Sequence, residues 1–189
     1  MSIFGFKRNA AGLVGLYDKI GAGVAAFTVD GGTLETKDGL TFPAVQVPCA
    51  NVNTLDAYEE GHNTTGWIPT IAFGGVGVTG ITYGTQYGTY VKIGRAVFYS
   101  GQITLTSKGT DVGQIYILGL PFVSAADITH PASFQARTTS FADQITVNQI
   151  PGTATLRFYQ SSNAGVLSVL DDTSLANNSV LFFAGHYFI

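Results

Sequence analysis

The stretch RAVFYSGQITLT, residues 95–106, alternates between two kinds of side chain with a period of two. The more apolar set consists of Val97, Tyr99, Gly101, Ile103 and Leu105. The more polar set consists of Phe98, Ser100, Gln102, Thr104 and Thr106. Successive side chains of a β-strand point to opposite faces of a sheet, so this pattern predicts an antiparallel strand with one buried face and one face toward water.

Runs of the same kind recur on both sides of this stretch, with turn signals between them. They are WIPTIAFGG, GITYGTQYGTYVKIG, QIYILGLPF, SFQARTTSF, QITVNQI, ATLRFYQS, VLSVL and SVLFFAGHYFI. About nine or ten short strands, with a turn signal every 8 to 12 residues or so, are typical of a sandwich or a jelly roll. We therefore predict an antiparallel, jelly-roll-like β-sandwich domain over residues 51–189.

The composition supports an all-β fold. Charged residues make up 11% of the chain, which is less than half of the roughly 25% that is usual in soluble domains. The chain contains 24 Gly, 13 Phe and 9 Tyr but one Met, a balance that favours strands and tight turns over helices. Intrinsic disorder is not expected, because disordered chains are rich in charge and poor in apolar residues.

Charge and cysteine content exclude several function classes. The net charge is −3, and Lys7-Arg8 is the one basic pair in an otherwise scattered set, so no nucleic-acid partner is expected. Cys49 is the single cysteine, which rules out an intrachain disulfide and favours a small core residue over a reactive thiol. No cofactor or metal is predicted.

No segment of the sequence predicts membrane insertion. The apolar stretch at residues 20–29 has about half of the roughly 20 residues that a spanning helix needs. Asp18 and Lys19 interrupt the apolar region that a signal peptide would require. Synthesis in a cytoplasm, followed by assembly into a larger particle, is the expectation.

Residues 1–50 contain short apolar stretches that are broken by glycine. Some apolar residues fall at helical spacing, but each intervening glycine costs a helix about 1 kcal/mol relative to alanine. A segment of this kind could hardly build its own core, so we expect an arm that docks on another surface. Its candidate docking residues are Phe4, Phe6, Leu13, Leu16, Tyr17 and Ile20.

The final run, VLFFAGHYFI, is apolar on both of its alternating faces. In an antiparallel sandwich the domain's own core covers one face of each strand, so the second face needs another cover. We predict that a second copy of the chain supplies it. The candidate interface residues are Phe182, Phe183, His186, Tyr187 and Phe188.

No catalytic constellation is predicted. Glu59-Glu60 and Asp171-Asp172 are adjacent pairs, whose side chains point to opposite faces of an extended chain and so cannot flank one sugar; solvated turn residues are the favoured interpretation. The three histidines are far apart and lack the spacing of a metal site. The glycine-rich stretch at residues 74–80 lacks a phosphate-loop ending and predicts a hairpin tip. The chain is therefore expected not to be an enzyme.

Several ordered motifs carry a resemblance to a known protein group. They are Phe42-Pro43-Ala44 with Gln46, Asn51 with Thr54-Leu55-Asp56, Tyr58 to Gly61, Trp67 to Pro69, Tyr83 to Gly94, Ile103 to Gly109 and Gly119 to Phe122. Over about residues 38–189 the chain resembles the C-terminal region of bacteriophage and prophage tail-fibre and virion-surface proteins. This sequence departs from that group by inserting HNTTG at residues 62–66, and by having some 40 residues, instead of a long shaft, before the module.

The resemblance implies a homotrimeric tail appendage on the virion surface, which docks on another virion protein and touches a host-surface glycan. The short preceding segment leaves open a capsid decoration protein, whose arm would clamp neighbouring capsid subunits. A glycan depolymerase is the least favoured alternative. In each case residues 51–73 form a hinge between arm and displayed domain, with Tyr58 and Trp67 as apolar pegs, EEGHNTTG as the turn between them and Pro69 marking an edge strand.

Overall fold

The computed structural model describes residues 5–8, 14–17, 57–63, 66–141 and 143–189. The chain divides into two compact units, residues 1–41 and 42–189. The predicted boundary between residues 50 and 51 lies outside the described residues, as do residues 51–56 and 64–65 of the predicted hinge.

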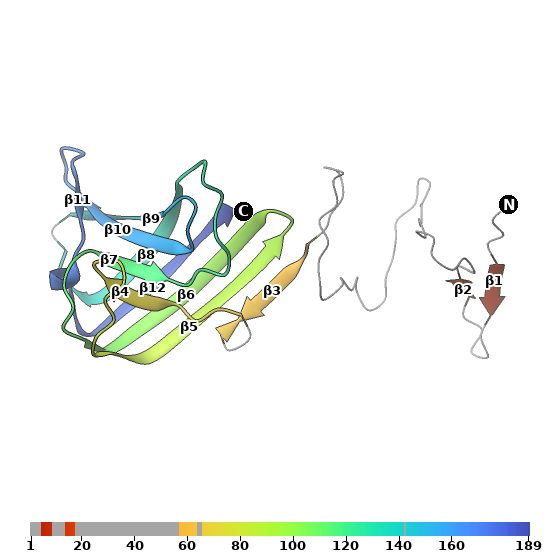
Figure 1. Ribbon diagram of the computed structural model, residues 1–189, viewed down its shortest axis with the longest axis horizontal. Helices are drawn as coiled ribbons and strands as arrows, with labels where there is room; N and C mark the ends of the chain where they lie inside the picture. Colours follow the sequence, from red (N-terminus) through yellow and green to blue (C-terminus); the bar gives the residue numbers. More distant parts are fainter. Residues whose placement is uncertain (1–4, 9–13, 18–56, 64–65, 142) are drawn as a thin grey trace. The chain divides into compact units, whose positions relative to one another are not determined.

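The first unit contains a two-stranded antiparallel sheet (Figure 1). Strand β1 (Gly5–Arg8) pairs with β2 (Val14–Tyr17), and Phe6 lies opposite Leu16 in the register. Residues 14–17 therefore form a strand, although apolar residues of this segment fall at helical spacing. Among the predicted docking residues, Phe6, Leu16 and Tyr17 lie on these strands, while Phe4, Leu13 and Ile20 lie outside the described residues.

The second unit is an antiparallel sheet of ten strands in the described part of the chain. The strands are β3 (Glu59–His62), β4 (Thr70–Phe73), β5 (Ile81–Ile93), β6 (Ala96–Lys108), β7 (Ile115–Leu118), β8 (His130–Thr139), β9 (Gln144–Gln149), β10 (Thr155–Ser161), β11 (Leu167–Val169) and β12 (Leu175–Phe188). Their spatial order is β3-β5-β6-β12-β8-β9-β10-β7-β4, and β11 pairs with β10 outside this path. A short 3-10 turn, η2 (Asp172–Ser174), precedes β12.

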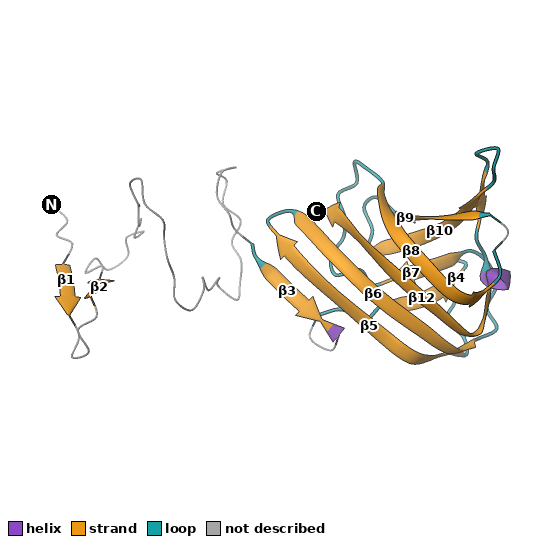
Figure 2. Ribbon diagram, turned by 180° about the vertical axis from the view of Figure 1, so that it is seen from behind, coloured by secondary structure: helices purple, strands orange, loops and turns teal. Residues whose placement is uncertain are grey.

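The sheet curls on itself, so that one continuous sheet forms both layers of the sandwich. The long strands β5, β6 and β12 lie side by side, and the shorter strands at the other end of the order cover one of their faces (Figures 1 and 2). The core between the layers joins Ile103 and Leu181 of the long strands to Ile71, Ile117 and Leu156 of the short ones. The prediction of an all-β, sandwich-like domain is confirmed, including the alternation of burial along residues 95–106.

The inner face of the long strands packs aromatic rings against glycines. A methyl group added at Gly88 would lie 2.6 Å from the Trp67 ring, and one added at Gly101 would lie 2.6 Å from the Phe183 ring. The two rings also contact one another edge-on, with their centroids 5.9 Å apart. A residue without a side chain is needed for so close an approach, so these glycines define where the rings sit in the core.

Side chains of β5 reach the free edge of β4. The Gln86 amide nitrogen donates to the Pro69 carbonyl at 3.0 Å, and the Ile71 N–H donates to the Tyr83 hydroxyl at 3.2 Å. These bonds satisfy backbone groups that an edge strand would otherwise leave to solvent or to another chain. Strand β4 ends the spatial order, which confirms that Pro69 marks an edge strand.

The hinge prediction is correct for Trp67 and wrong for its surroundings. Trp67 is buried, as expected of an apolar peg, but Tyr58 is exposed and donates to Glu60 at 3.0 Å. Glu59–His62 is strand β3 and pairs with β5 instead of forming a turn. The backbone ladder with β5 requires an extended conformation there, which the charged sequence of this short strand does not signal.

Candidate binding site on the outer face of the sheet

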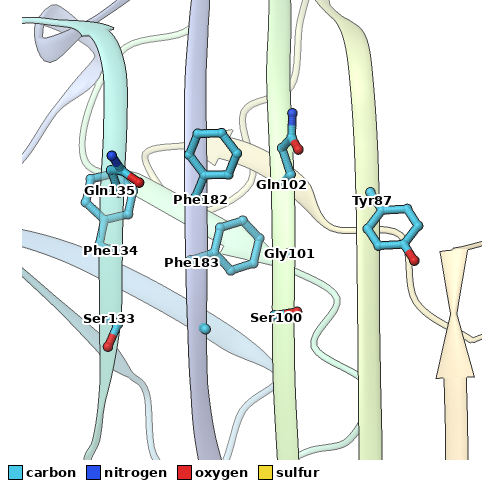
Figure 3. A pocket seen from close by; sticks show the side chains of 10 residues that line it. Tyr87, Ser100, Gly101, Gln102, Ser133, Phe134, Gln135, Phe182 and Phe183 are labelled. Carbon is cyan, nitrogen blue, oxygen red and sulfur yellow. The ribbon is translucent and has the colours of Figure 1, made fainter.

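Four adjacent strands place a row of large side chains on the outer face of the sheet. Gln102 of β6 lies opposite Tyr87 of β5 and Phe182 of β12, and Phe182 lies opposite Gln135 of β8. The row therefore runs aromatic, amide, aromatic, amide, with neighbouring strands about 4.8 Å apart. Figure 3 shows these four side chains on four adjacent strands.

Small residues form the next row and leave a hollow beside the large ones. Ser100 lies opposite Thr89 on one side and Ala184 on the other, and Ala184 lies opposite Ser133. The hollow has a volume of about 430 Å³, which is within the range of roughly 300 to 1,000 Å³ found for small-molecule sites. The backbone of Gly101 contributes to its lining (Figure 3).

A second, smaller hollow adjoins the first one at Ser100. It has a volume of about 230 Å³ and lies between β5 and β6, where Thr89, Val91 and Phe98 line it. Half of the Phe98 surface is exposed. We call the two hollows together the outer trough.

The lining of the outer trough is uncharged. Its polar groups are hydroxyls and amides, and the side chains of Tyr87 and Gln135 make no hydrogen bond within the described part of the chain. The Gln102 amide has one long bond, in which its nitrogen donates to the Thr104 hydroxyl at 3.4 Å. Arg137 lies outside the lining and stacks on the Phe182 ring at 5.4 Å. The trough thus offers unpaired donors and acceptors between apolar rings.

An aromatic patch follows the outer trough toward the C-terminal end of β12. Its rings are Phe98, His186 and Phe188, with centroids 6.0 Å and 6.3 Å apart in that order, and His130 lies beside Phe188 at 5.7 Å. His186 and Phe188 are exposed. We call Phe98, His186 and Phe188 the aromatic patch.

The predicted interface residues separate into two groups. Phe182, His186 and Phe188 lie on the outer face, where a second chain could reach them. Phe183 and Tyr187 are buried in the core, so assigning them to an intersubunit contact was wrong. The reason is that the short-strand layer covers the inner face of β12 completely, and the Tyr187 hydroxyl is held there by the backbone of Phe122 through two bonds of 3.0 Å.

The adjacent carboxylate pairs have separate structural partners. The Tyr90 hydroxyl donates to Glu59 at 2.6 Å, whereas Glu60 accepts from Tyr58. Burial and the hydrogen bond to Glu59 raise the pKa of Tyr90 to about 12. These contacts hold the two carboxyl groups at strand β3 in different hydrogen bonds.

The second pair lies at η2. Asp171 caps this turn by accepting from the Thr173 N–H at 3.1 Å. Asp172 is buried, contrary to the expectation of a solvated turn residue, and it accepts from the Gly113 N–H at 2.8 Å and from Lys108 Nζ at 3.1 Å. Burial alone would raise the pKa of Asp172, but these two donors outweigh it and lower the pKa below its ordinary value.

Within the described residues, no group of three or more His, Cys, Asp and Glu side chains could hold a metal ion. His130 and His186, which are far apart in the sequence, come together with ring centroids 6.3 Å apart. None of the helices in the described part of the chain has the length and apolar character needed to cross a membrane.

Among the residues that line the outer trough, sequence reasoning singled out Phe182 and Phe183, as interface residues, but not Tyr87, Gln102 or Gln135. Tyr87, Gln102 and Gln135 come from three strands, and strand register alone brings them into one row. The available signal was the outward set of residues 95–106, which contains Phe98, Ser100 and Gln102.

Among solved structures, the chain is similar to the crystal structure of the Dettilon tailspike protein, with a TM-score of 0.53 and 12% sequence identity. The match covers 68% of this chain and 24% of the tailspike chain, so the tailspike is much the longer protein. At this level of identity the match shows a shared fold alone. No protein-family model and no curated protein sequence matches this chain.

Proposed function

We propose that this chain is a non-enzymatic structural protein of a bacteriophage virion: a homotrimeric tail appendage, docked through residues 1–50, whose domain over residues 51–189 contacts the host surface. The fold shared with part of a phage tailspike is the observation that carries this proposal. The ordered motifs from Phe42 to Phe122 point to the same class of protein.

The aromatic patch is the surface through which the copies meet in this proposal. Exposed fractions of 50% for Phe98 and 44% for Phe188 are high for rings of this size, and the rings are contiguous. Contiguous exposed apolar surface is a mark of protein–protein contact, and aromatic residues are enriched at such contacts.

A binding role without catalysis fits the chemistry of the outer face. Neither hollow of the outer trough is lined by a carboxylate, a histidine or a cysteine, so the trough offers no general acid, general base or nucleophile of the usual kinds except the hydroxyls of Tyr87, Ser100 and their neighbours. The adjacent carboxylates are engaged in the hydrogen bonds of β3 and η2.

Light scattering on the purified full chain tests the oligomer. The wild-type chain is expected to have the mass of three chains, and His186→Ser with Phe188→Ser is expected to release monomers. Val166→Ser with Leu167→Ser is the matched control, because these residues are 64% and 54% exposed on the other layer. A monomeric wild type, or an unchanged mass for the patch variant, would contradict assembly through the aromatic patch.

Electron microscopy with gold-labelled antibody tests the position on the particle. The label is expected on the tail, and it should disappear from particles whose chain lacks residues 1–50. A label spread over the head would identify a capsid decoration protein instead. Particles without label would contradict a role in the virion.

A further inference from the structure

We propose that His130 and His186 make the contact between copies at the aromatic patch sensitive to acid, so that protonation of the two imidazoles separates the copies. This inference rests on the proposed function, because the contact that it regulates is the one proposed there. It goes beyond that function by naming the condition under which the contact opens and the two side chains that sense it.

The fold brings together two histidines that are distant in the sequence. His130 is the first residue of β8, and His186 lies near the end of β12. Their ring centroids lie 6.3 Å apart, and Phe188 lies 5.7 Å from His130 and 6.3 Å from His186. Two imidazolium ions at this separation repel one another, and the repulsion grows where water is excluded. The arrangement therefore suits two neutral imidazoles better than two charged ones.

The strands beside the two histidines offer them uncharged neighbours. Phe98 of β6 lies opposite His186 in the register, and its ring centroid is 6.0 Å from the imidazole. Gln149 of β9 lies opposite His130. A protonated imidazole gains no ionic stabilisation from either neighbour.

The titratable groups at this end of the domain do not offset a proton on either imidazole. Arg95, in the turn before β6, adds positive charge and donates from Nε to the Ile189 carbonyl at 2.7 Å. Asp127, in the loop before β8, is exposed, and no carboxylate in the described part of the chain forms an ion pair with either imidazole. On the inner side, burial raises the pKa of Tyr99 and of Tyr187, so both hydroxyls stay neutral in acid.

His130 has little room for a positive charge. Its side chain is 5% exposed, and its Nε2 atom makes no hydrogen bond in the described part of the chain. A protonated imidazole carries two N–H donors, so a proton added to His130 would leave a buried donor without an acceptor. Such a donor costs free energy, and acid therefore opposes the position of this ring beside Phe188.

Assembly through the aromatic patch extends this cost to His186. In the single chain His186 is exposed, and water stabilises its charged form. The patch of another copy would remove that water and bring no carboxylate in exchange. The assembled state therefore binds the proton less tightly than the separate chain does. Assembly is favoured at neutral pH and is lost as the pH falls through the range in which histidines change charge, about pH 8 to 5.

Light scattering on dilution series of the full chain, at about pH 7.5 and about pH 5.5, tests this inference. We expect the trimer of the wild-type chain to weaken by about tenfold for each copy at the lower pH. A histidine with the ordinary pKa of about 6.5 that must lose its proton to assemble supplies about this factor. His62→Asn is the matched control, because His62 is exposed on β3, and its response should equal that of the wild type.

Variants with a fixed charge separate the proton from the shape of the side chain. His186→Phe keeps a ring in the aromatic patch that cannot be protonated, so it should stay assembled at both pH values. His186→Lys keeps a positive charge there, so it should be monomeric at both. His130→Leu should show a smaller response than the wild type, because His186 then titrates without its charged neighbour.

Near-ultraviolet circular dichroism at both pH values establishes that the separated chains remain folded. A wild-type trimer that is equally stable at both pH values would overturn the acid response while leaving the proposed function in place. Dissociation of His186→Phe in acid, or a full wild-type response in His130→Leu, would overturn the assignment to this pair. A wild type that is monomeric even at the higher pH would contradict the proposed assembly itself, and the acid response with it.

Discussion

The inner and outer faces of β5, β6 and β12 use similar residues, but they are filled differently. On the inner face, the Trp67 and Phe183 rings lie directly on Gly88 and Gly101. On the outer face, rings also stand beside small residues such as Ser100, yet a hollow of about 430 Å³ remains. The same alternation along the strands therefore produces one packed face and one open face.

This difference separates the face that stabilises the fold from the face that carries the candidate binding site. The short-strand layer removes the inner rings from water, and burying a large side chain of this kind contributes about 1.5 to 3 kcal/mol. No described element covers Tyr87 or Phe98, so these outer rings contribute little to folding. Substitutions on the two faces should therefore separate loss of fold from loss of binding.

The largest expected difference in stability is between alanine variants of two neighbouring phenylalanines, Phe183 and Phe182. Phe183→Ala should lower the free energy of unfolding by about 3 to 5 kcal/mol, because it leaves a cavity in the packed core. Phe182→Ala should lower it by less than about 1 kcal/mol, since its half-buried ring loses chiefly the contact with Arg137. Urea denaturation of both variants measures the difference. Equal losses would mean that the outer face is covered in the assembled protein.

Much of the fold could be predicted from the sequence because burial follows the period of two. Residues 96–106 lie on β6 with the expected faces, and Pro69 precedes the expected edge strand. The buried face of β12 could not be identified from the sequence in this way, because Phe182 and Phe183, which lie on opposite faces, are equally apolar. Only the covering layer decides which of the two is core, and that layer comes from strands distant in the sequence.

The candidate site could not be predicted, because it exists only through register. Tyr87, Gln102 and Gln135 are separated by 15 and 33 positions in the printed sequence, and each is unremarkable alone. A shift of one residue in any strand would move its side chain to the other face. Glu59 and Glu60 show the converse, since their sequence suggested a turn while pairing with β5 makes them a strand.

A smaller expected effect concerns the hydroxyl groups buried on the inner face. Burial raises the pKa of Tyr187 to about 12, an effect that nearby Tyr90 increases and the hydrogen bond to the Phe122 backbone opposes. Burial, followed by the neighbouring Tyr187, also raises the pKa of Tyr99. A tyrosine in the unfolded chain ionises near pH 10, so the folded state binds the proton more tightly. The stabilisation is therefore complete below about pH 10 and is lost as the pH rises toward 12.

Each buried tyrosine should lose on the order of 2 kcal/mol of stabilisation as the pH rises through this range, and replacing it with phenylalanine should remove that loss. Tyr99→Phe should change the stability at neutral pH by less than about 1 kcal/mol, because the Tyr99 hydroxyl makes no hydrogen bond in the described part of the chain. Tyr187→Phe should cost about 1 to 2 kcal/mol at neutral pH, since it leaves the Phe122 N–H and carbonyl without their partner. Urea denaturation at pH values from about 8 to 12 measures both quantities. If wild type and Tyr99→Phe lose stability in parallel across this range, the inner face admits water to its hydroxyls, and the contrast with the open outer face is weaker than the packing implies.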